Sequence, residues 1–400
     1  MFSRVLIANR GEIAIRIARA AKALGIDSLG VYAELDKDSL HTRYPNNSVQ
    51  LPRDASSDAV GSYLNQENLI RIATENDCDC LHPGYGFLSE NADFAERCAE
   101  SGITFVGPTP AQLRLFGDKV QARKYAAGLG IPTIPGSVAA SNRVDDLIDT
   151  AEAIGYPVML KAVAGGGGRG MRTVNDRSEL ERVFDSCSRE AEAAFGNGDL
   201  FLEKLVVNAR HIEVQVFGDT DGNLVHLYER ECSLQIRNQK VIEFAPAPNL
   251  DEDTREFIFL NALVLGSAEE YLNAGTFEFL LDVDTGAHYF IECNPRIQVE
   301  HTVTEQITGM DLVQLQFQLA SGITLVELGI HTQTDVEKPR GFSVQSRVVT
   351  KGSGTLHSYR EPSGPGIRVD ANGYTGYEVP ASFDPLIAKV VTSVTSNESF

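Results

Sequence analysis

The sequence predicts a mixed α/β and α+β protein, in which a doubly wound α/β unit precedes a central region and a C-terminal part rich in short strands. Three observations lead to this prediction. Residues 1–115 alternate apolar strands with amphipathic helices, which is typical of a parallel sheet covered by helices on both faces. A second region begins near residue 116 and contains an apolar hairpin at residues 275–291. Beyond residue 335 the composition shifts to short strands and turn-rich loops.

The composition limits the classes of function. The chain has 400 residues, of which 42% are hydrophobic and 22% charged, as in soluble globular proteins. Its formal net charge is −20, which argues against nucleic acid or an anionic membrane as a partner. No apolar run approaches the length of a membrane span. The first strand starts near residue 5, so we expect no targeting peptide unless Met1 is not the native start. The six cysteines show no Cys-x-x-Cys spacing. We therefore expect a cytoplasmic protein with reduced thiols, without a zinc site or a disulfide framework.

The N-terminal unit contains four predicted strands and an amphipathic helix. The helix covers residues 13–24, and the strands are expected at residues 5–8, 28–32, 79–81 and 103–106. The turn from Asn9 to Glu12 lacks the Gly-x-Gly-x-x-Gly spacing, so a dinucleotide site is not supported. The second region then starts with a predicted helix at residues 119–129 and a proline-containing boundary at residues 131–135.

A run of glycines joins two predicted strands of the second region, at residues 158–161 and 171–174. Consecutive glycines let the backbone approach a ligand closely, with N–H groups turned toward phosphate oxygens. Lys161 before the run and Arg169 inside it favour a phosphate-binding flap over a simple linker. The run precedes no helix and lacks the P-loop pattern. Its glycines are Gly165, Gly166, Gly167 and Gly168.

Three polar patterns follow. Glu203 and Lys204 end a strand and could receive an adenine and a ribose, or form an ordinary surface ion pair. Residues 210–216 alternate as a half-exposed strand, and His211 shares a face with Glu213, a pair that is more often structural than metal-binding. Residues 229–240 are dense in polar groups between apolar strands, and a solvated loop is the simplest account of them.

The hairpin carries the strongest chemical signal. If the turn between its strands centres near Thr285, Glu278 falls directly opposite Glu292, and Asn294 shares their face because side chains alternate with period two. Opposed like charges are destabilising, and a divalent cation between them converts repulsion into attraction. Oxygen ligands of this kind suit Mg²⁺, which usually also binds substrate phosphates. The alternative is a surface hairpin whose glutamates point to water, although both strands look too apolar for that position.

The region after residue 335 contains a strand at residues 341–349, a turn-rich loop at residues 362–366 and further strands out to residues 388–392. The sequence stops at Phe400 without a closing helix, so we expect it to be a fragment of a longer protein.

Four motifs together resemble biotin carboxylase, a member of the ATP-grasp superfamily. They are residues 9–14, residues 82–91, the glycine run and residues 294–301. The resemblance implies an N-terminal α/β domain at residues 1–115, an ATP-grasp domain at residues 116–334 with a mobile lid at about residues 135–205, and a C-terminal domain at residues 335–400. It also implies a reaction that joins bicarbonate to biotin at the expense of ATP, through carboxyphosphate.

The resemblance assigns expected roles residue by residue. ATP would be held by Lys119, Lys161, Glu203, Lys204, Leu205, His211, Gln235 and Asn238, with the glycine flap closing over its phosphates. Mg²⁺ or Mn²⁺ would be carried by Glu278, Glu292 and Asn294. Bicarbonate would be positioned by Lys240, Arg296, Gln298 and Val299. Glu300 would be the general base, and Arg347 would stabilise the charge on the ureido oxygen of biotin.

Two departures from the family pattern leave the acceptor of the carboxyl group open. Ile236 and Asn238 stand where many members have arginine and histidine, and the loop after Arg347 is short. An acyl-CoA carboxylase is the first expectation, with pyruvate or urea carboxylase as alternatives. Another ATP-grasp ligase of the carbamoyl-phosphate type, or a non-catalytic ATP-binding regulatory module, is the competing function. Expected partners are a biotin carboxyl carrier domain and a carboxyltransferase, and the chain could form a homodimer or larger homo-oligomer.

Overall fold

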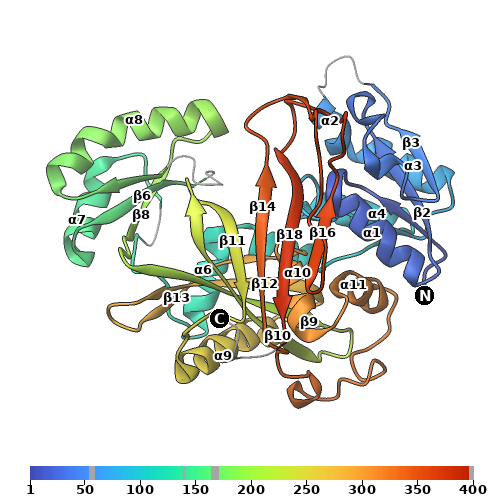
Figure 1. The fold of residues 1–400 in the computed structure, drawn as a ribbon. Helices are drawn as coiled ribbons and strands as arrows, with labels where there is room; N and C mark the ends of the chain where they lie inside the picture. Colours follow the sequence, from blue (N-terminus) through green and yellow to red (C-terminus); the bar gives the residue numbers. More distant parts are fainter. Residues whose placement is uncertain (54–58, 138–139, 164–170, 396–400) are drawn as a thin grey trace.

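The computed structural model describes residues 1–53, 59–137, 140–163 and 171–395 (Figure 1). The glycines from Gly165 to Gly168 therefore lie outside the described residues. Within the described residues, no helix combines the length and the apolar character needed to cross a membrane.

The N-terminal unit is a five-stranded parallel sheet in the order β3-β2-β1-β4-β5. Its side chains alternate between two faces. Val5 and Ile7 pack against α1, while Leu6 and Ala8 pack on the opposite side. The prediction of a doubly wound unit is confirmed. The elements are β1 (Arg4–Ile7), α1 (Gly11–Ala23), β2 (Asp27–Tyr32), β3 (Asn47–Gln50), α2 (Ala59–Leu64), α3 (Gln66–Glu75), β4 (Cys80–His82), α4 (Ala92–Glu100), β5 (Thr104–Phe105) and α5 (Pro110–Gly117).

A small sheet with the order β7-β6-β8 lies apart from the N-terminal unit (Figure 1). Its core contains Leu147, Val158, Leu180 and Leu202, so two helices and the sheet bury one another. The elements of this region are α6 (Lys119–Gly128), α7 (Val144–Ile154), β6 (Val158–Ala162), β7 (Met171–Val174), α8 (Arg177–Phe195) and β8 (Leu200–Lys204). The two strands predicted on either side of the glycine run are confirmed, and they pair antiparallel.

An eight-stranded sheet in the order β13-β12-β9-β10-β11-β14-β18-β16 forms the centre of the molecule. The C-terminal strands extend the central sheet, since β14 pairs with β11. Strands of the last region therefore share one sheet with the hairpin. The strands are β9 (Ala209–Gly218), β10 (Leu224–Ile236), β11 (Gln239–Ala245), β12 (Asn273–Asp282), β13 (His288–Asn294), β14 (Phe342–Val349), β16 (Ile367–Ala371) and β18 (Leu386–Val394). A separate pair is formed by β15 (Gly354–Thr355) and β17 (Glu378–Val379).

Two sequence-based expectations for this sheet are wrong. Most of β9 is buried on both faces rather than half-exposed, because Arg230 covers its polar face and bonds to Glu213 and Gln215. Residues 229–240 are not a solvated loop. They form most of the β10–β11 hairpin, whose turn places Arg237 and Asn238 at positive φ, a conformation that Asn tolerates better than most residues.

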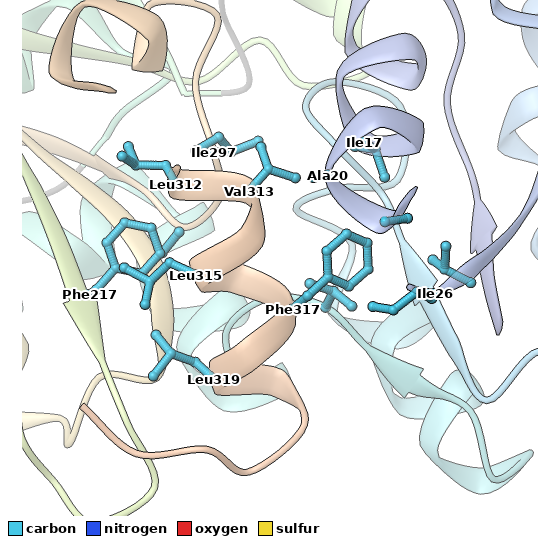
Figure 2. Close-up of a cluster of buried hydrophobic side chains, with 14 of the residues drawn as sticks. Ile17, Ala20, Ile26, Phe217, Ile297, Leu312, Val313, Leu315, Phe317 and Leu319 are labelled. Atoms are coloured by element: carbon cyan, nitrogen blue, oxygen red, sulfur yellow. The ribbon is translucent and has the colours of Figure 1, made fainter. Parts of the chain in front are cut away.

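Three helices complete the framework around the central sheet. They are α9 (Glu252–Ala268), α10 (His301–Thr308) and α11 (Leu312–Ala320). Figure 2 shows α11 lying between α1 and the central sheet, with Leu315 and Leu319 toward Phe217, and Phe317 toward Ala20 and Ile26. Ile297 belongs to the same buried cluster. The core therefore anchors the segment just before Gln298 to both the N-terminal unit and the central sheet.

Candidate active site

A cavity of about 1220 Å³ lies where the three regions meet. Its lining includes Tyr85 from the N-terminal unit, Lys161 from β6, the hairpin residues Glu278 and Glu292, and Arg347 from β14. The site is therefore built from segments that are far apart in the sequence.

The β12–β13 hairpin pairs the two glutamates that the sequence predicts to be opposed. Glu278 pairs directly with Glu292, and a bulge between Glu278 and Phe279 shifts the register of the residues nearer the turn. The amide of Asn294 donates to Glu278 Oε1 over 2.7 Å. Glu278 is buried, whereas Glu292 is half-buried and forms an ion pair with Lys119. Both carboxylates line the cavity, so the alternative of a surface hairpin with glutamates turned to bulk water is not what forms.

Lys240 sits at the centre of a buried group of carboxylates. Its Nζ lies 2.5 Å from Glu213 Oε2, 3.0 Å from Glu278 Oε1 and 2.7 Å from Glu300 Oε1. Burial alone would lower the pKa of Lys240, but the three carboxylates outweigh burial and raise it well above its usual value. An ammonium that is charged at neutral pH thus stands between the hairpin and Glu300.

Glu300 is held between two cations. Its Oε2 accepts a hydrogen bond of 2.9 Å from Arg347 Nη2, while Arg347 Nε donates to Glu243 Oε1 over 2.6 Å. Burial opposes ionisation of Glu300, but Lys240 and Arg347 overcome it and lower the pKa of this carboxyl below its usual range. Glu300 is therefore an ionised carboxylate at neutral pH, positioned to accept a hydrogen bond or a proton.

The residues before Glu300 complete this wall of the cavity. Arg296 Nε donates to Glu90 Oε1 over 2.6 Å, and Arg296 Nη2 donates to Asn294 Oδ1 over 3.1 Å. The amide of Gln298 donates to Glu278 Oε1 over 2.8 Å, and Val299 also lines the cavity. The segment from Asn294 to Glu300 therefore points a series of polar groups toward one space.

The opposite end of the cavity contains the residues expected to bind the nucleotide. Glu203 is buried and forms ion pairs with Arg123 and Lys161, rather than a surface pair with Lys204. Lys204 Nζ donates instead to the carbonyl oxygens of Gly155 and Tyr156, over 2.9 Å and 3.2 Å. Lys204 and Leu205 do not line the described cavity, whereas Lys119, Lys161, Glu203, His211, Gln235 and Asn238 do.

His211 links this end to the hairpin. Its Nε2 lies 2.6 Å from Glu278 Oε2, and its Nδ1 lies 3.0 Å from the amide nitrogen of Gln235. His211, Glu213 and Glu278 have ligand atoms close enough to share a metal ion. Lys240 already bonds to both glutamates, which supports the structural interpretation of the His211–Glu213 pair.

The comparisons with known proteins agree with this architecture. The family model of the biotin carboxylase N-terminal domain matches residues 1–113, that of the carbamoyl-phosphate synthase L chain ATP-binding domain matches residues 118–328, and that of the biotin carboxylase C-terminal domain matches residues 345–399. The biotin carboxylase of a Nostoc strain is 44% identical over 98% of this chain and 87% of the relative. The chain belongs to the biotin carboxylase family.

Other members of the biotin carboxylase family are parts of larger enzymes. Pyruvate carboxylase of Aspergillus niger is 44% identical over 97% of the chain, which spans only 33% of that relative. The biotin carboxylase domain of 2-oxoglutarate carboxylase from Hydrogenobacter thermophilus, solved as a dimer with MgADP, ADP and bicarbonate, matches with a TM-score of 0.93 and 42% identity, over 99% of this chain and 87% of that one. Rhizobium etli pyruvate carboxylase matches with a TM-score of 0.92 and 44% identity, over 98% of this chain and 36% of that one. The predicted biotin carboxylase resemblance and ATP-grasp fold are confirmed.

The donor set on the hairpin fits the magnesium ion that biotin carboxylases are expected to use. The carboxylates of Glu278 and Glu292 and the side-chain carbonyl of Asn294 offer oxygen ligands, which a hard divalent cation prefers. Glu292 is half-buried and forms an ion pair with Lys119. A metal ion in the cavity can therefore replace the Lys119 ammonium at this carboxylate without disturbing buried side chains.

Several residues that organise the site were missed by sequence reasoning. Arg230 is completely buried and donates to Glu213, and Glu243 holds Arg347. Arg123 and Glu90 pair with Glu203 and Arg296. A charged residue within an apolar strand, such as Glu243 between Ile242 and Phe244, is the signal that could have found Glu243, because such a charge requires a buried partner. Arg230 lies between Glu229 and Glu231 and carries no such signal.

Proposed function

We propose that this chain catalyses the ATP-dependent carboxylation of biotin by bicarbonate, as the first half-reaction of a carboxylase whose final acceptor is a 2-oxo acid. The observation that carries the proposal is the position of Glu300, which is ionised, lies between Lys240 and Arg347, and lines the same cavity as the opposed hairpin glutamates. Family membership supports the same reaction.

In this proposal Glu300 is the general base. Bicarbonate binds between Lys240 and Arg296, with Gln298 and the backbone of Val299 fixing its orientation, and Glu300 accepts its proton. Bicarbonate is a poor nucleophile, so positioning and a nearby base must both contribute. Arg347 then offsets the negative charge that develops on the ureido oxygen of biotin.

ATP occupies the other end of the cavity. Lys119 and Lys161 bring positive charge to its phosphates, and the cavity residues Glu203, His211, Gln235 and Asn238 hold the adenosine. The expected contacts of Lys204 and Leu205 with ATP stay predictions, since neither residue lines the described cavity. Glu278, Glu292 and Asn294 would hold Mg²⁺ or Mn²⁺, which when bound supplies charge neutralisation for the transferred phosphoryl group. Gly165 to Gly168 remain a predicted phosphate flap, which would exclude water from a hydrolysable intermediate.

We further propose a domain division at about residues 115 and 335, with a lid at about residues 135–205. Biotin would arrive on a carrier domain, and a carboxyltransferase would complete the reaction. The dimeric relative supports a homodimer as a candidate assembly, and the cytoplasmic location stays a prediction.

The acceptor proposed here differs from our sequence-based first choice of an acyl-CoA. The similar proteins include several pyruvate carboxylases and a 2-oxoglutarate carboxylase, which support the pyruvate alternative. Because the chain spans about a third of the pyruvate carboxylases, the acceptor depends on segments that these relatives possess beyond the matched part.

Two measurements test the proposal. Purified protein should cleave ATP only with bicarbonate and Mg²⁺ present, and free biotin should increase the rate. Equal ATP cleavage without bicarbonate, or ATP binding without any cleavage, would contradict it. The complete carboxylase should then transfer labelled bicarbonate to pyruvate or 2-oxoglutarate, and transfer to acetyl-CoA alone would reject the 2-oxo acid acceptor.

A further inference from the structure

Lys389 is a completely buried lysine at the centre of β18. Its Nζ lies 3.0 Å from Glu12 Oε1 and donates to the backbone carbonyl of Val299 over 3.0 Å. Glu12 comes from the first turn of α1, and Val299 precedes Glu300. One ammonium therefore joins the N-terminal unit, the C-terminal strands and the segment that carries the proposed base.

A buried ammonium requires compensation, because burial of an unpaired charge is very unfavourable. Glu12 is the carboxylate paired with Lys389, and it is itself buried. Tyr85, which lines the cavity, donates its hydroxyl to Glu12. Lys389 also stands directly opposite Arg347 in the sheet, with Asp370 opposite it on the other side. Lys389 is therefore paired with the residue of β14 that contacts Glu300.

The backbone of the turn before α10 is held at two successive carbonyls. His301 Nδ1 lies 2.6 Å from the carbonyl oxygen of Gln298 and donates to it, while Lys389 binds the next carbonyl, that of Val299. Both holding side chains are completely buried. Because the carbonyls of Gln298 and Val299 are both held, the backbone between them has little freedom to rotate. These two hydrogen bonds therefore fix the directions in which the side chains of Gln298 and Glu300 leave the backbone.

We propose that Lys389, neutralised by Glu12, is a positioning residue that fixes the turn at Gln298 to Glu300 so that Glu300 meets bicarbonate in the correct orientation. Lys389 does not line the cavity and touches no substrate position. It acts through the Val299 carbonyl. The proposal rests on the proposed function and adds to it a residue, from the C-terminal strands, that controls the use of bicarbonate.

The test separates positioning from simple stabilisation. The double variant Glu12→Gln/Lys389→Met neutralises both partners, so that no unpaired buried charge remains, but it removes the bond to the Val299 carbonyl. Measured on the full-length protein, the KM for bicarbonate should rise about tenfold or more while the KM for ATP changes less than about twofold. The matched control is Glu229→Gln/Arg255→Met, which removes an ion pair of 3.0 Å between α9 and β10; the Glu229 carboxylate bonds to Arg255 and to the backbone of Ala247 rather than to the turn. It should leave both KM values unchanged.

A second variant guards against loss of folding. Lys389→Arg keeps the charge and a donor, and it should retain part of the bicarbonate affinity that the double variant loses. A double variant that retains the original bicarbonate KM overturns the proposal, as does an equal rise in the KM for ATP. Failure of the proposed function is recognised separately, since the unmodified protein would then cleave ATP without needing bicarbonate.

Discussion

Glu278 lies directly opposite Glu292 in the β12–β13 pair, and both carboxylates line the same cavity. Lys240, His211, Asn294 and Gln298 surround the first of them, while Lys119 pairs with the second. Cationic side chains hold the two acids in place, and the less buried Glu292 remains the one that a cation from the cavity can approach.

The opposed glutamates predict that the Mg²⁺ concentration required for ATP cleavage depends on both carboxylates. Glu292→Gln should raise the Mg²⁺ concentration needed for half-maximal ATP cleavage by about tenfold or more, because one anionic ligand is lost. Titration of the rate with MgCl₂ measures this shift. Glu75→Gln, which removes an exposed ion pair with Arg71, is the control and should not move the curve. An unchanged Mg²⁺ requirement in the Glu292 variant would remove the hairpin from the metal site.

Lys240→Met should inactivate the protein and also destabilise it. The change leaves three buried carboxylates without their shared cation, which costs about 3 kcal/mol or more by analogy with other buried pairs. Chemical denaturation monitored by circular dichroism measures the loss. Lys351→Met, at an exposed position, should leave stability within about 0.5 kcal/mol. A stable but inactive Lys240 variant would mean that its carboxylate partners become protonated instead.

Glu300→Gln should abolish most bicarbonate-dependent ATP cleavage while nucleotide binding persists. The amide keeps the size of the side chain but cannot accept a proton, and a positioned base contributes about a hundredfold to ten-thousandfold. Steady-state rates and calorimetric titration with ATP separate the two effects. Full activity in this variant would show that a group other than Glu300 is the general base.

Glu243 predicts the pH dependence of the site. Burial raises the pKa of Glu243 from 4.5 to about 7, even though Arg347 opposes the shift. Below about pH 7 the carboxyl is therefore protonated and its ion pair with Arg347 is weakened, so activity should fall as pH decreases through this value. The Glu243→Gln variant should not show this fall in activity below about pH 7. If the fall persists in the variant, another group causes it.

The raised pKa of Glu243 affects stability in the opposite direction to activity: stability is expected to decrease, rather than increase, as the pH rises. The folded protein binds the Glu243 proton more tightly than the unfolded chain, so this carboxyl's contribution to the free energy of unfolding decreases as pH rises from about 4.5 to about 7. Comparing the pH dependence of unfolding in the original protein and in Glu243→Gln measures the contribution. Variation in the reverse direction would contradict a raised pKa.

Local patterns determined a large part of the architecture. The alternation of apolar segments predicts the parallel N-terminal sheet. The two apolar segments and the short link between them predict the hairpin itself, whereas the pairing of Glu278 with Glu292 also depends on the bulge between Glu278 and Phe279. The motifs around Asn294 and His82 identify the family. These features depend on neighbours in sequence or on a single strand pair, so the sequence alone is sufficient for them.

Only the tertiary structure decided which charges meet. Residues 210–216 have the alternation of a half-exposed strand, yet Glu213 is buried because Arg230 and Lys240 from the next hairpin neutralise it. Glu12 and Lys389 come from opposite ends of the described chain and meet beside Val299. Periodicity reports which face of a strand is apolar, but the energy of a buried charge depends on its partner, and that partner is supplied by the way distant segments pack together.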